Sequence, residues 1–300
     1  MQLITWLALC VFGAVFGSFA GATVWRLRAK QLQYDQKNGE PVNKAEYKRL
    51  KPLLNGFSVK DRSRCLSCQH TLAWYDMLPL VSWLSTGGRC RYCKTLIGGF
   101  ELMIEIMTAT LFVLSYVYWP FTLASPLAWL QFGVWLAVVV GLVVIFWYDA
   151  KWFLVLWVTI WPLLLLGLVF VALAYAQAPS SSMLLSTAAA VVLLAGLYWL
   201  LWAVSKGRWV GLGDAQIGAV LGLVLLDWQK AFLALILANA IGTMIVLPAL
   251  LTKKISRSSA VPFGALLITG ALVSFFWGSA IIAWFTVDFS LWLGKLMYPY

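Results

Sequence analysis

The sequence is poor in charged residues and contains a single histidine. Asp, Glu, Lys and Arg make up only 11% of its 300 residues, about half the share found in soluble domains. Catalysis by Ser-His or Cys-His pairs, or by a histidine-bound metal, would depend entirely on His70. This scarcity directs the search for catalytic groups to the carboxylates.

Long apolar runs, by contrast, are abundant. The mean hydropathy is +0.86, and the runs are continuous rather than alternating, which is typical of membrane helices and not of barrel strands. The sequence therefore predicts an all-α integral membrane protein with about eight spans. We place them at residues 3–25, 100–119, 126–148, 152–176, 185–204, 210–226, 231–252 and 262–287. The sixth span is the weakest, because few apolar residues follow Asp214.

Basic residues are distributed unevenly along the chain. The net charge is +11, and 14 of the 22 Lys and Arg lie between Arg26 and Lys94. With eight spans and both termini outside, only Lys230 and Lys295 lie on the outer side, as the positive-inside rule requires. The charge thus predicts orientation, with a secondary role in binding anionic lipids, and not nucleic-acid binding. The remaining cytoplasmic basic residues are Lys151, Lys206, Arg208, Lys253, Lys254 and Arg257.

The first apolar run has two features of processed sequences. The letters AGA at residues 20–22 resemble a signal-peptide cleavage site, and LALC resembles a lipidation box around Cys10. Both signals normally follow a basic region, which is missing here, and the run is longer than a signal-peptide core. We therefore expect a retained first span, in which Cys10 is a small apolar side chain.

The composition defines three parts of the chain. We predict a first transmembrane helix at residues 1–25, a cytoplasmic loop at 26–97, and a seven-helix membrane catalytic domain at 98–300. Charged residues, Pro, Asn and Gln are concentrated in the loop. Its first half is interpreted as a solvated linker with one short helix near Lys44–Leu50.

The second half of the loop holds four of the five cysteines. They form two pairs, Cys65-x-x-Cys68 and Cys90-x-x-Cys93, separated by 21 residues. Two such pairs can surround one Zn²⁺ with a tetrahedron of thiolates. The alternative is two disulfides, which seldom persist on the reducing cytoplasmic side. A site made of four cysteines is closed to substrate, so we expect a structural zinc, with His70 at the surface or beside the ligands.

Two aspartates stand out among the eleven acids. Asp149 ends the third span and Asp214 begins the sixth, so the topology places both at the same membrane face. Two adjacent carboxylates share a proton, which lets one act as base and the other as acid, as in aspartic proteases. Singly, Asp149 could instead pair with Lys151 or mark a helix end, and Asp214 could be an N-cap.

Glycines precede the second aspartate in the tetrapeptide Gly211-Leu-Gly213-Asp214. Glycine allows close backbone approach and a positive φ, which would suit a loop that admits an extended peptide. Glu101 and Glu105 are four residues apart and share a helix face. They are interpreted either as structural hydrogen-bond acceptors or as groups near the site.

These residues together resemble the prepilin peptidases, the bifunctional type IV leader peptidase and N-methyltransferase family of membrane aspartic proteases with a GxGD motif. The resemblance covers most of the chain. It rests on FGSFAGATVWRL near the first span's end, RCLSCQHTLAWYDMLPLVSWLSTGGRCRYC in the loop, ELMIEIMTATLF in the second span, YDAKWF around Asp149 and GLGDA around Asp214.

The resemblance implies a bacterial inner-membrane enzyme. Asp149 and Asp214 would cleave the basic leader of prepilins or pseudopilins at the cytoplasmic face, and S-adenosylmethionine would methylate the new N-terminus. The chain has Gly21 where the family usually has Asn, and Gln216 where it usually has Lys. A peptidase without methyltransferase activity therefore remains an alternative, as do a presenilin-like intramembrane protease and a non-enzymatic transporter or zinc scaffold.

Overall fold

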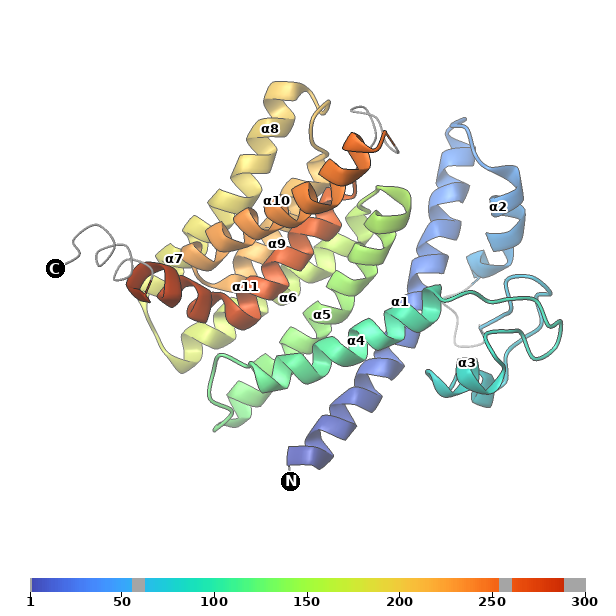
Figure 1. Ribbon diagram of the computed structural model, residues 1–300, viewed down its shortest axis with the longest axis horizontal. Coiled ribbons are helices and arrows are strands. Elements are labelled where there is room, and N and C mark those ends of the chain that lie inside the picture. The colour runs from blue at the N-terminus through green and yellow to red at the C-terminus, as the bar shows by residue number, and fades with distance from the viewer. Residues whose placement is uncertain (1, 56–62, 254–260, 289–300) are drawn as a thin grey trace. The chain divides into compact units, whose positions relative to one another are not determined.

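The structure is a computed structural model that describes residues 2–55, 63–253 and 261–288. Lys254, Arg257 and Lys295, which the orientation argument counts, lie outside the described residues. Two compact units make up the chain, Met1–Tyr116 and Val117–Tyr300. The described residues form helices and contain no strand, only two isolated β-bridges (Figure 1).

The predicted helical membrane fold is confirmed. Seven helical stretches are long and apolar enough to cross a membrane, and an eighth apolar helix, Leu212–Leu225, is shorter. The weak sixth span of the sequence is this short helix. The long helices are α1 (Gln2–Lys37), α4 (Phe100–Val117), α5 (Pro126–Trp152), α6 (Trp157–Gln177), α10 (Trp228–Leu251) and α11 (Phe263–Ala283). The seventh stretch combines α7 (Ser181–Val191), a π-helical turn at Val192–Gly196 and α8 (Leu197–Ser205).

In the first unit, α1 and α4 contact each other through two glycines of α1. A Cβ on Gly13 would lie 2.6 Å from Ala109 Cα, and one on Gly17 would lie 2.6 Å from Glu105 Cα. Small residues four apart allow membrane helices to approach this closely, so that their backbones pack directly. The contact fixes the part of α4 that carries Glu105.

Replacing Gly17 by leucine is expected to separate α1 from α4. The new side chain would overlap the α4 backbone, which cannot move aside as a flexible side chain can. We expect a destabilisation of about 1–3 kcal/mol or more, as for other overpacked sites, measured as a lower thermal midpoint in detergent. Gly133→Leu is the matched control, because nothing lies within 4 Å of a Cβ at Gly133. Equal midpoints for the two variants would contradict this packing.

The short helix predicted near Lys44–Leu50 is confirmed, but the interpretation of the first half of the loop as a solvated linker is wrong. The first helix continues to Lys37, and α2 (Lys44–Leu50) packs back against it. Ala29, Leu32 and Leu50 form a buried apolar cluster between them. The Arg28 guanidinium adds a bidentate ion pair to Glu46, with Nε–Oε1 at 3.0 Å and Nη2–Oε2 at 2.8 Å. These few apolar residues are enough to order a segment that is polar on average.

In the second unit, the short helix α9 (Leu212–Leu225) is surrounded by longer ones. It contacts α6, α7, α8, α10 and α11. Gly218 and Gly222 allow the approach, because a Cβ on either would lie under 3 Å from the backbone of Leu194 or Val191. An aromatic core lies nearby, in which the rings of Trp135 and Phe275 stack with centroids 3.8 Å apart. The helix that carries Asp214 is therefore firmly held by its neighbours.

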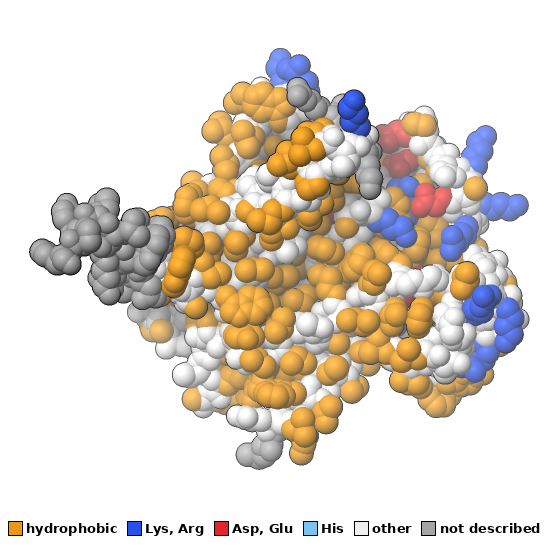
Figure 2. Space-filling model, viewed as in Figure 1, with side chains coloured by type: hydrophobic (Ala, Val, Ile, Leu, Met, Phe, Trp, Pro, Cys, Tyr) orange, Lys and Arg blue, Asp and Glu red, His pale blue; other side chains and the backbone are white. Residues whose placement is uncertain are grey.

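Side-chain types are segregated on the surface of each unit. In Figure 2, apolar side chains cover α10, as expected for a surface in contact with lipid. Charged side chains gather over α2 and the loops of the first unit. Each unit thus has the surface of a membrane-embedded body, and the loop of the first unit is its polar part.

Candidate functional site

Asp149 and Asp214 both lie in the second unit, and Asp149 is next to the N-terminus of α11. Asp149 lies in the last turn of α5 and is only 5% exposed. Its Oδ2 atom accepts a hydrogen bond from the backbone N–H of Ala265, at 2.9 Å. Asp214 lies in the first turn of α9, is partly exposed, and is within electrostatic range of Asp149. Two carboxyl groups that are distant in the sequence therefore face one small region.

The start of α11 is a part of this region that the sequence reasoning missed. A Cβ on Gly264 would lie 3.0 Å from Asp149 Oδ2 and 2.7 Å from Ile217 Cδ1, so any larger residue would push against both helices. The free N–H groups of a helix N-terminus favour a carboxylate. The sequence feature that could have indicated this helix start is the presence of Pro262 and Gly264 at the beginning of an apolar run.

The glycines before Asp214 were expected to give a positive φ, and this is wrong. Gly211 is an extended N-cap with φ −75°, and neither it nor Gly213 is among the residues with positive φ. Close approach is confirmed for Gly213, where a Cβ would lie 2.6 Å from Val155 Cβ. Gly213 thus lets the segment after α5 lie against the start of α9.

The simpler roles considered for the two aspartates are not those seen. The N-cap of α9 is Gly211, and Asp214 is the third residue of the helix. The Asp149 carboxylate is bonded to α11 at Ala265, although it also lies near a helix end as predicted. Asp214 does accept a hydrogen bond from the backbone N–H of Gly211, the N-cap of its own helix, whereas Asp149 accepts from the start of α11.

The four paired cysteines of the first unit form one cluster. The sulfur atoms of Cys65, Cys68, Cys90 and Cys93 all lie within 4.8 Å of one another, and the Cys65 and Cys93 sulfurs are 3.9 Å apart. A tetrahedral zinc with bonds of about 2.3 Å requires sulfurs about 3.8 Å apart. All four are free thiols. The donor set and its spacing fit a Zn²⁺ ion, as the sequence predicted.

The two Cys-x-x-Cys turns have the same backbone geometry. Gln69 N–H donates to Cys65 O and Lys94 N–H to Cys90 O, both at 2.9 Å. The residue after each pair is left-handed, with φ 61° at Gln69 and 58° at Lys94. An isolated bridge flanks each turn, Arg64 with Thr71 and Arg89 with Leu96. The segment is therefore built from two equivalent knuckles that face each other.

The thiols of the second knuckle differ in acidity before any metal binds. Hydrogen bonding with the side chain and backbone of Thr95 lowers the pKa of the Cys93 thiol to about 6. Burial raises the pKa of Cys90, against smaller opposing effects of the backbone N–H groups of Cys93 and Tyr92. Cys93 is thus the thiol best prepared to bind a cation as thiolate.

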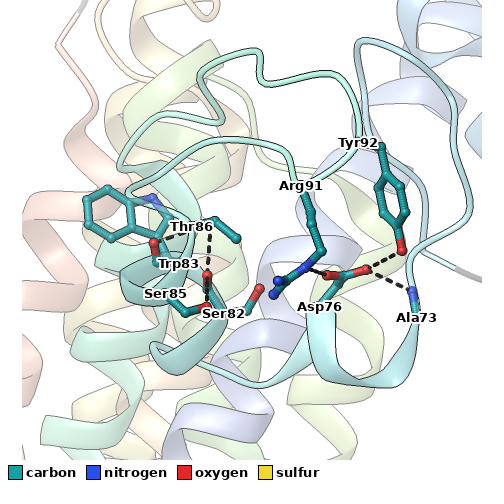
Figure 3. A network of polar contacts seen from close by, with 8 residues as sticks. All are labelled: Ala73, Asp76, Ser82, Trp83, Ser85, Thr86, Arg91 and Tyr92. Atoms are coloured by element: carbon teal, nitrogen blue, oxygen red, sulfur yellow. Dashed lines mark hydrogen bonds and ion pairs between the residues drawn. The ribbon is translucent and has the colours of Figure 1, made fainter.

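Asp76 ties the second knuckle to the segment between the cysteine pairs (Figure 3). Its carboxylate accepts from Arg91 Nε at 2.9 Å, from Tyr92 Oη at 2.9 Å and from Ala73 N at 3.1 Å. Burial opposes its ionisation, but the hydrogen bonds from Arg91, Tyr92 and Ala73 prevail and hold the pKa of Asp76 below its usual value. No role was predicted for Asp76 from the sequence beyond its place in the loop. The Trp-Tyr-Asp stretch between the pairs was the available signal.

Asp76→Ala is expected to loosen the second knuckle. Arg91, Tyr92 and Ala73 would lose their common acceptor, at a cost of about 1.5–3 kcal/mol for hydrogen bonds to a charged group. We expect faster zinc release to a chelator, measured with a colorimetric zinc indicator. Asp227→Ala serves as control, since Asp227 caps α10 in the other unit. An unchanged release rate in Asp76→Ala would show that the network does not support the cluster.

Glu105 and His70 also have structural contacts. Glu105 Oε2 accepts from the backbone N–H of Leu80 at 2.8 Å, and so holds a loop residue whose φ is +59°. This is the structural role considered for Glu105. His70 is exposed, and its ring lies 3.7 Å from that of Tyr92. It belongs to the surface of the knuckles, as expected, and the metal-type cluster consists of cysteines alone.

Comparisons with known proteins agree with these features. The family described as Bacterial Peptidase A24 N-terminal domain matches residues 11–119. The chain is 26% identical to a prepilin leader peptidase/N-methyltransferase of Aeromonas hydrophila, over 93% of each chain. It is 29% identical to the Pseudomonas aeruginosa protein of the same name, over 92% of this chain and 91% of the relative. No solved structure matches the chain.

Fold and site together define a multi-pass helical membrane protein that combines a four-cysteine cluster with a pair of neighbouring aspartates. The matches make the likeness more specific. Over most of its length the chain is similar to prepilin leader peptidases/N-methyltransferases, and residues 11–119 match the N-terminal domain of the bacterial A24 peptidases. The family match to residues 11–119 includes all four paired cysteines, and the full-length relatives extend the likeness over both aspartates.

Proposed function

We propose that this protein is an aspartic endopeptidase that cleaves the basic leader of prepilins or pseudopilins at the cytoplasmic face of the bacterial inner membrane. We further propose that it methylates the new N-terminus with S-adenosylmethionine. The observation that carries the peptidase function is the electrostatic proximity of Asp149 and Asp214, with Asp149 beside the N-terminus of α11. The names of the relatives support the substrate class and the methyl transfer.

In this mechanism, Asp149 and Asp214 are the catalytic residues and share one proton. The ionised carboxylate takes a proton from a water molecule as the water oxygen attacks the scissile carbonyl carbon. The protonated carboxyl group donates its proton to the carbonyl oxygen, which gives a neutral tetrahedral diol. On collapse, the carbon–nitrogen bond breaks, the leaving nitrogen takes the proton that the first carboxylate took from water, and a diol hydroxyl returns a proton to the other carboxylate. The products are the leader's carboxyl end and a new α-amine.

Gly211 and Gly213 are proposed to shape the active-site loop. Gly213 needs no space for a side chain and lets Val155 lie against the start of α9. Gly211 is exposed and extended, a conformation that can lie beside an extended peptide. A side chain at Gly211 would project toward Asp214, because its Cβ would lie 3.7 Å from Asp214 Oδ2.

Cys65, Cys68, Cys90 and Cys93 are proposed to hold a structural zinc. The ion would cross-link the two knuckles. Its role would be structural, because four thiolate ligands leave no coordination position open for substrate. We propose that this segment is cytoplasmic and that both termini are outside, following the positive-inside rule. S-adenosylmethionine would supply the methyl group for the freed amine, leaving S-adenosylhomocysteine and a proton.

Mass spectrometry of a processed substrate tests both activities. The purified protein in proteoliposomes is incubated with a prepilin, with and without S-adenosylmethionine. We expect one cut at the leader junction, and a mass increase of one methyl group only when the donor is present. A cut inside the substrate's own span would favour a presenilin-like protease. Absence of any cut would favour the transporter or scaffold alternative, and a cut without methylation would identify a peptidase alone.

A further inference from the structure

A cavity of about 220 Å³ lies entirely within the first unit. It is enclosed by α1, the start of α4 and the cysteine segment, and its walls include Trp25 and Trp83. It lies outside the second unit, where both aspartates are found. Concave sites with apolar walls and a few polar groups are typical of small-molecule binding. The peptidase mechanism does not use it.

One wall of the cavity carries an unsatisfied carboxylate. Glu101 Oε1 accepts from Trp25 Nε1 at 2.9 Å, whereas Glu101 Oε2 is buried and has no hydrogen-bond partner among the described residues. Glu105, one turn along α4, also lines the cavity and is within electrostatic range of Glu101. A buried acceptor without a donor is costly and rare. This side of the cavity therefore favours a positively charged ligand group.

Basic side chains line the cavity from the cysteine segment. Arg64 and Arg89 are both exposed and belong to equivalent positions, each just before the first cysteine of a knuckle. Guanidinium groups are well suited to bind carboxylates. The cavity thus has acidic groups on α4 and basic groups on the knuckles, with the two tryptophans also in its walls, and Arg26 and Arg49 add further positive charge from α1 and α2. A ligand with a cationic part, an aromatic part and a carboxylate would match this arrangement.

We propose that this cavity binds S-adenosylmethionine, with its sulfonium group at Glu101 and its carboxylate toward Arg64 and Arg89. The inference rests on the proposed methyltransferase function and adds the site where the donor binds. The unpaired Glu101 oxygen and the tryptophan walls are the features that fit the group. The chain has no glycine-rich nucleotide motif, so the site could not be predicted from a sequence motif.

The test compares two ligands that differ by one charge. S-adenosylhomocysteine lacks the sulfonium methyl group and its positive charge. Binding is measured by calorimetry on the full-length, zinc-loaded protein in detergent. We expect Glu101→Gln to weaken S-adenosylmethionine binding about tenfold, as for a lost hydrogen bond to a charged group, and to change S-adenosylhomocysteine binding less than about twofold. Trp83→Phe, a second change in the wall, should weaken both.

Two controls keep the outcomes separate. Glu46→Gln removes an acid of the same unit that pairs with Arg28 and does not line the cavity, so it should leave binding unchanged. Zinc content is measured for every variant. If Glu101→Gln loses zinc, Glu101→Asp is used in its place. Equal affinity for S-adenosylmethionine in the native, Glu101→Gln and Trp83→Phe proteins would overturn the proposed site.

The failure of the site and the failure of the function give different results. Asp149→Asn should keep full S-adenosylmethionine binding, because the aspartates lie in the other unit. Methyl transfer by the native protein together with unchanged binding in both cavity variants would overturn the site and leave the proposed function standing. A native protein that neither binds the donor nor transfers a methyl group would overturn both.

Discussion

Asp149→Asn and Asp214→Asn are each expected to reduce leader cleavage by about 10²–10⁴-fold, the range for loss of a general acid or base. Asparagine matches aspartate in size but neither takes up nor releases a proton, so the shared-proton chemistry stops. In Asp149→Asn the amide oxygen can still accept from Ala265 N–H, so the start of α11 should stay in place. Cleavage of a prepilin in proteoliposomes is the measurement.

Asp227→Asn is the matched control for these variants. Asp227 lies in the same unit, caps α10 and accepts from Gln229 N–H at 2.8 Å, but it is not near the pair. Its cleavage rate should change less than about twofold, as for most substitutions away from a special site. A normal rate in either Asp149→Asn or Asp214→Asn, with the protein stably inserted, would exclude the dyad mechanism.

The double variant Cys65→Ser/Cys68→Ser is expected to abolish zinc binding. Two of four thiolates would be lost, and structural zinc typically contributes about 10–16 kcal/mol of apparent binding free energy in small domains. Bound zinc, measured by elemental analysis, should fall from one ion per chain to near zero. Methylation should be lost with it, because the knuckles form one side of the proposed donor cavity.

Cleavage should be less affected than methylation in this variant. The aspartates and the α11 N-terminus lie in the second unit, whereas the cysteines lie in the first. Cys10→Ser is the control, since Cys10 is exposed on α1 and outside the cluster. If the double variant still binds one zinc ion per chain, the four-cysteine assignment is wrong. If cleavage and methylation fall together, the zinc segment is also needed by the peptidase.

The features that could be predicted from the sequence depend on strong local patterns. Apolar runs define spans because a helix needs about 20 such residues to cross lipid, and two Cys-x-x-Cys pairs define a metal site by spacing alone. The spans and the cysteine cluster were therefore found in advance. The close approach at Gly213 followed from glycine itself.

The features that were missed depend on contacts between distant residues. The backbone N–H of Ala265 donates to Asp149, a residue 116 positions earlier in the sequence, and no local sequence pattern predicts that contact. The role of Asp76 became visible only when Arg91 and Tyr92 were placed beside it. The linker interpretation failed because a cluster as small as Ala29, Leu32 and Leu50 barely changes the average composition. The expected positive φ before Asp214 failed because glycine permits that conformation without requiring it.

The length of α9 has a consequence for the surrounding bilayer. Its 14 residues extend about 21 Å at 1.5 Å per residue, whereas a hydrocarbon core is about 30 Å thick. The helix ends at Leu225 and α10 starts at Trp228, so those two ends lie at about the same depth in the membrane. The opposite end of α9, with Asp214, then lies about 9 Å inside the hydrocarbon core, measured from the membrane surface on the Asp214 side. Because longer helices surround α9, this recess lies within the protein, and a thicker bilayer around the bundle would deepen the path that water and a peptide must travel to reach the carboxylates.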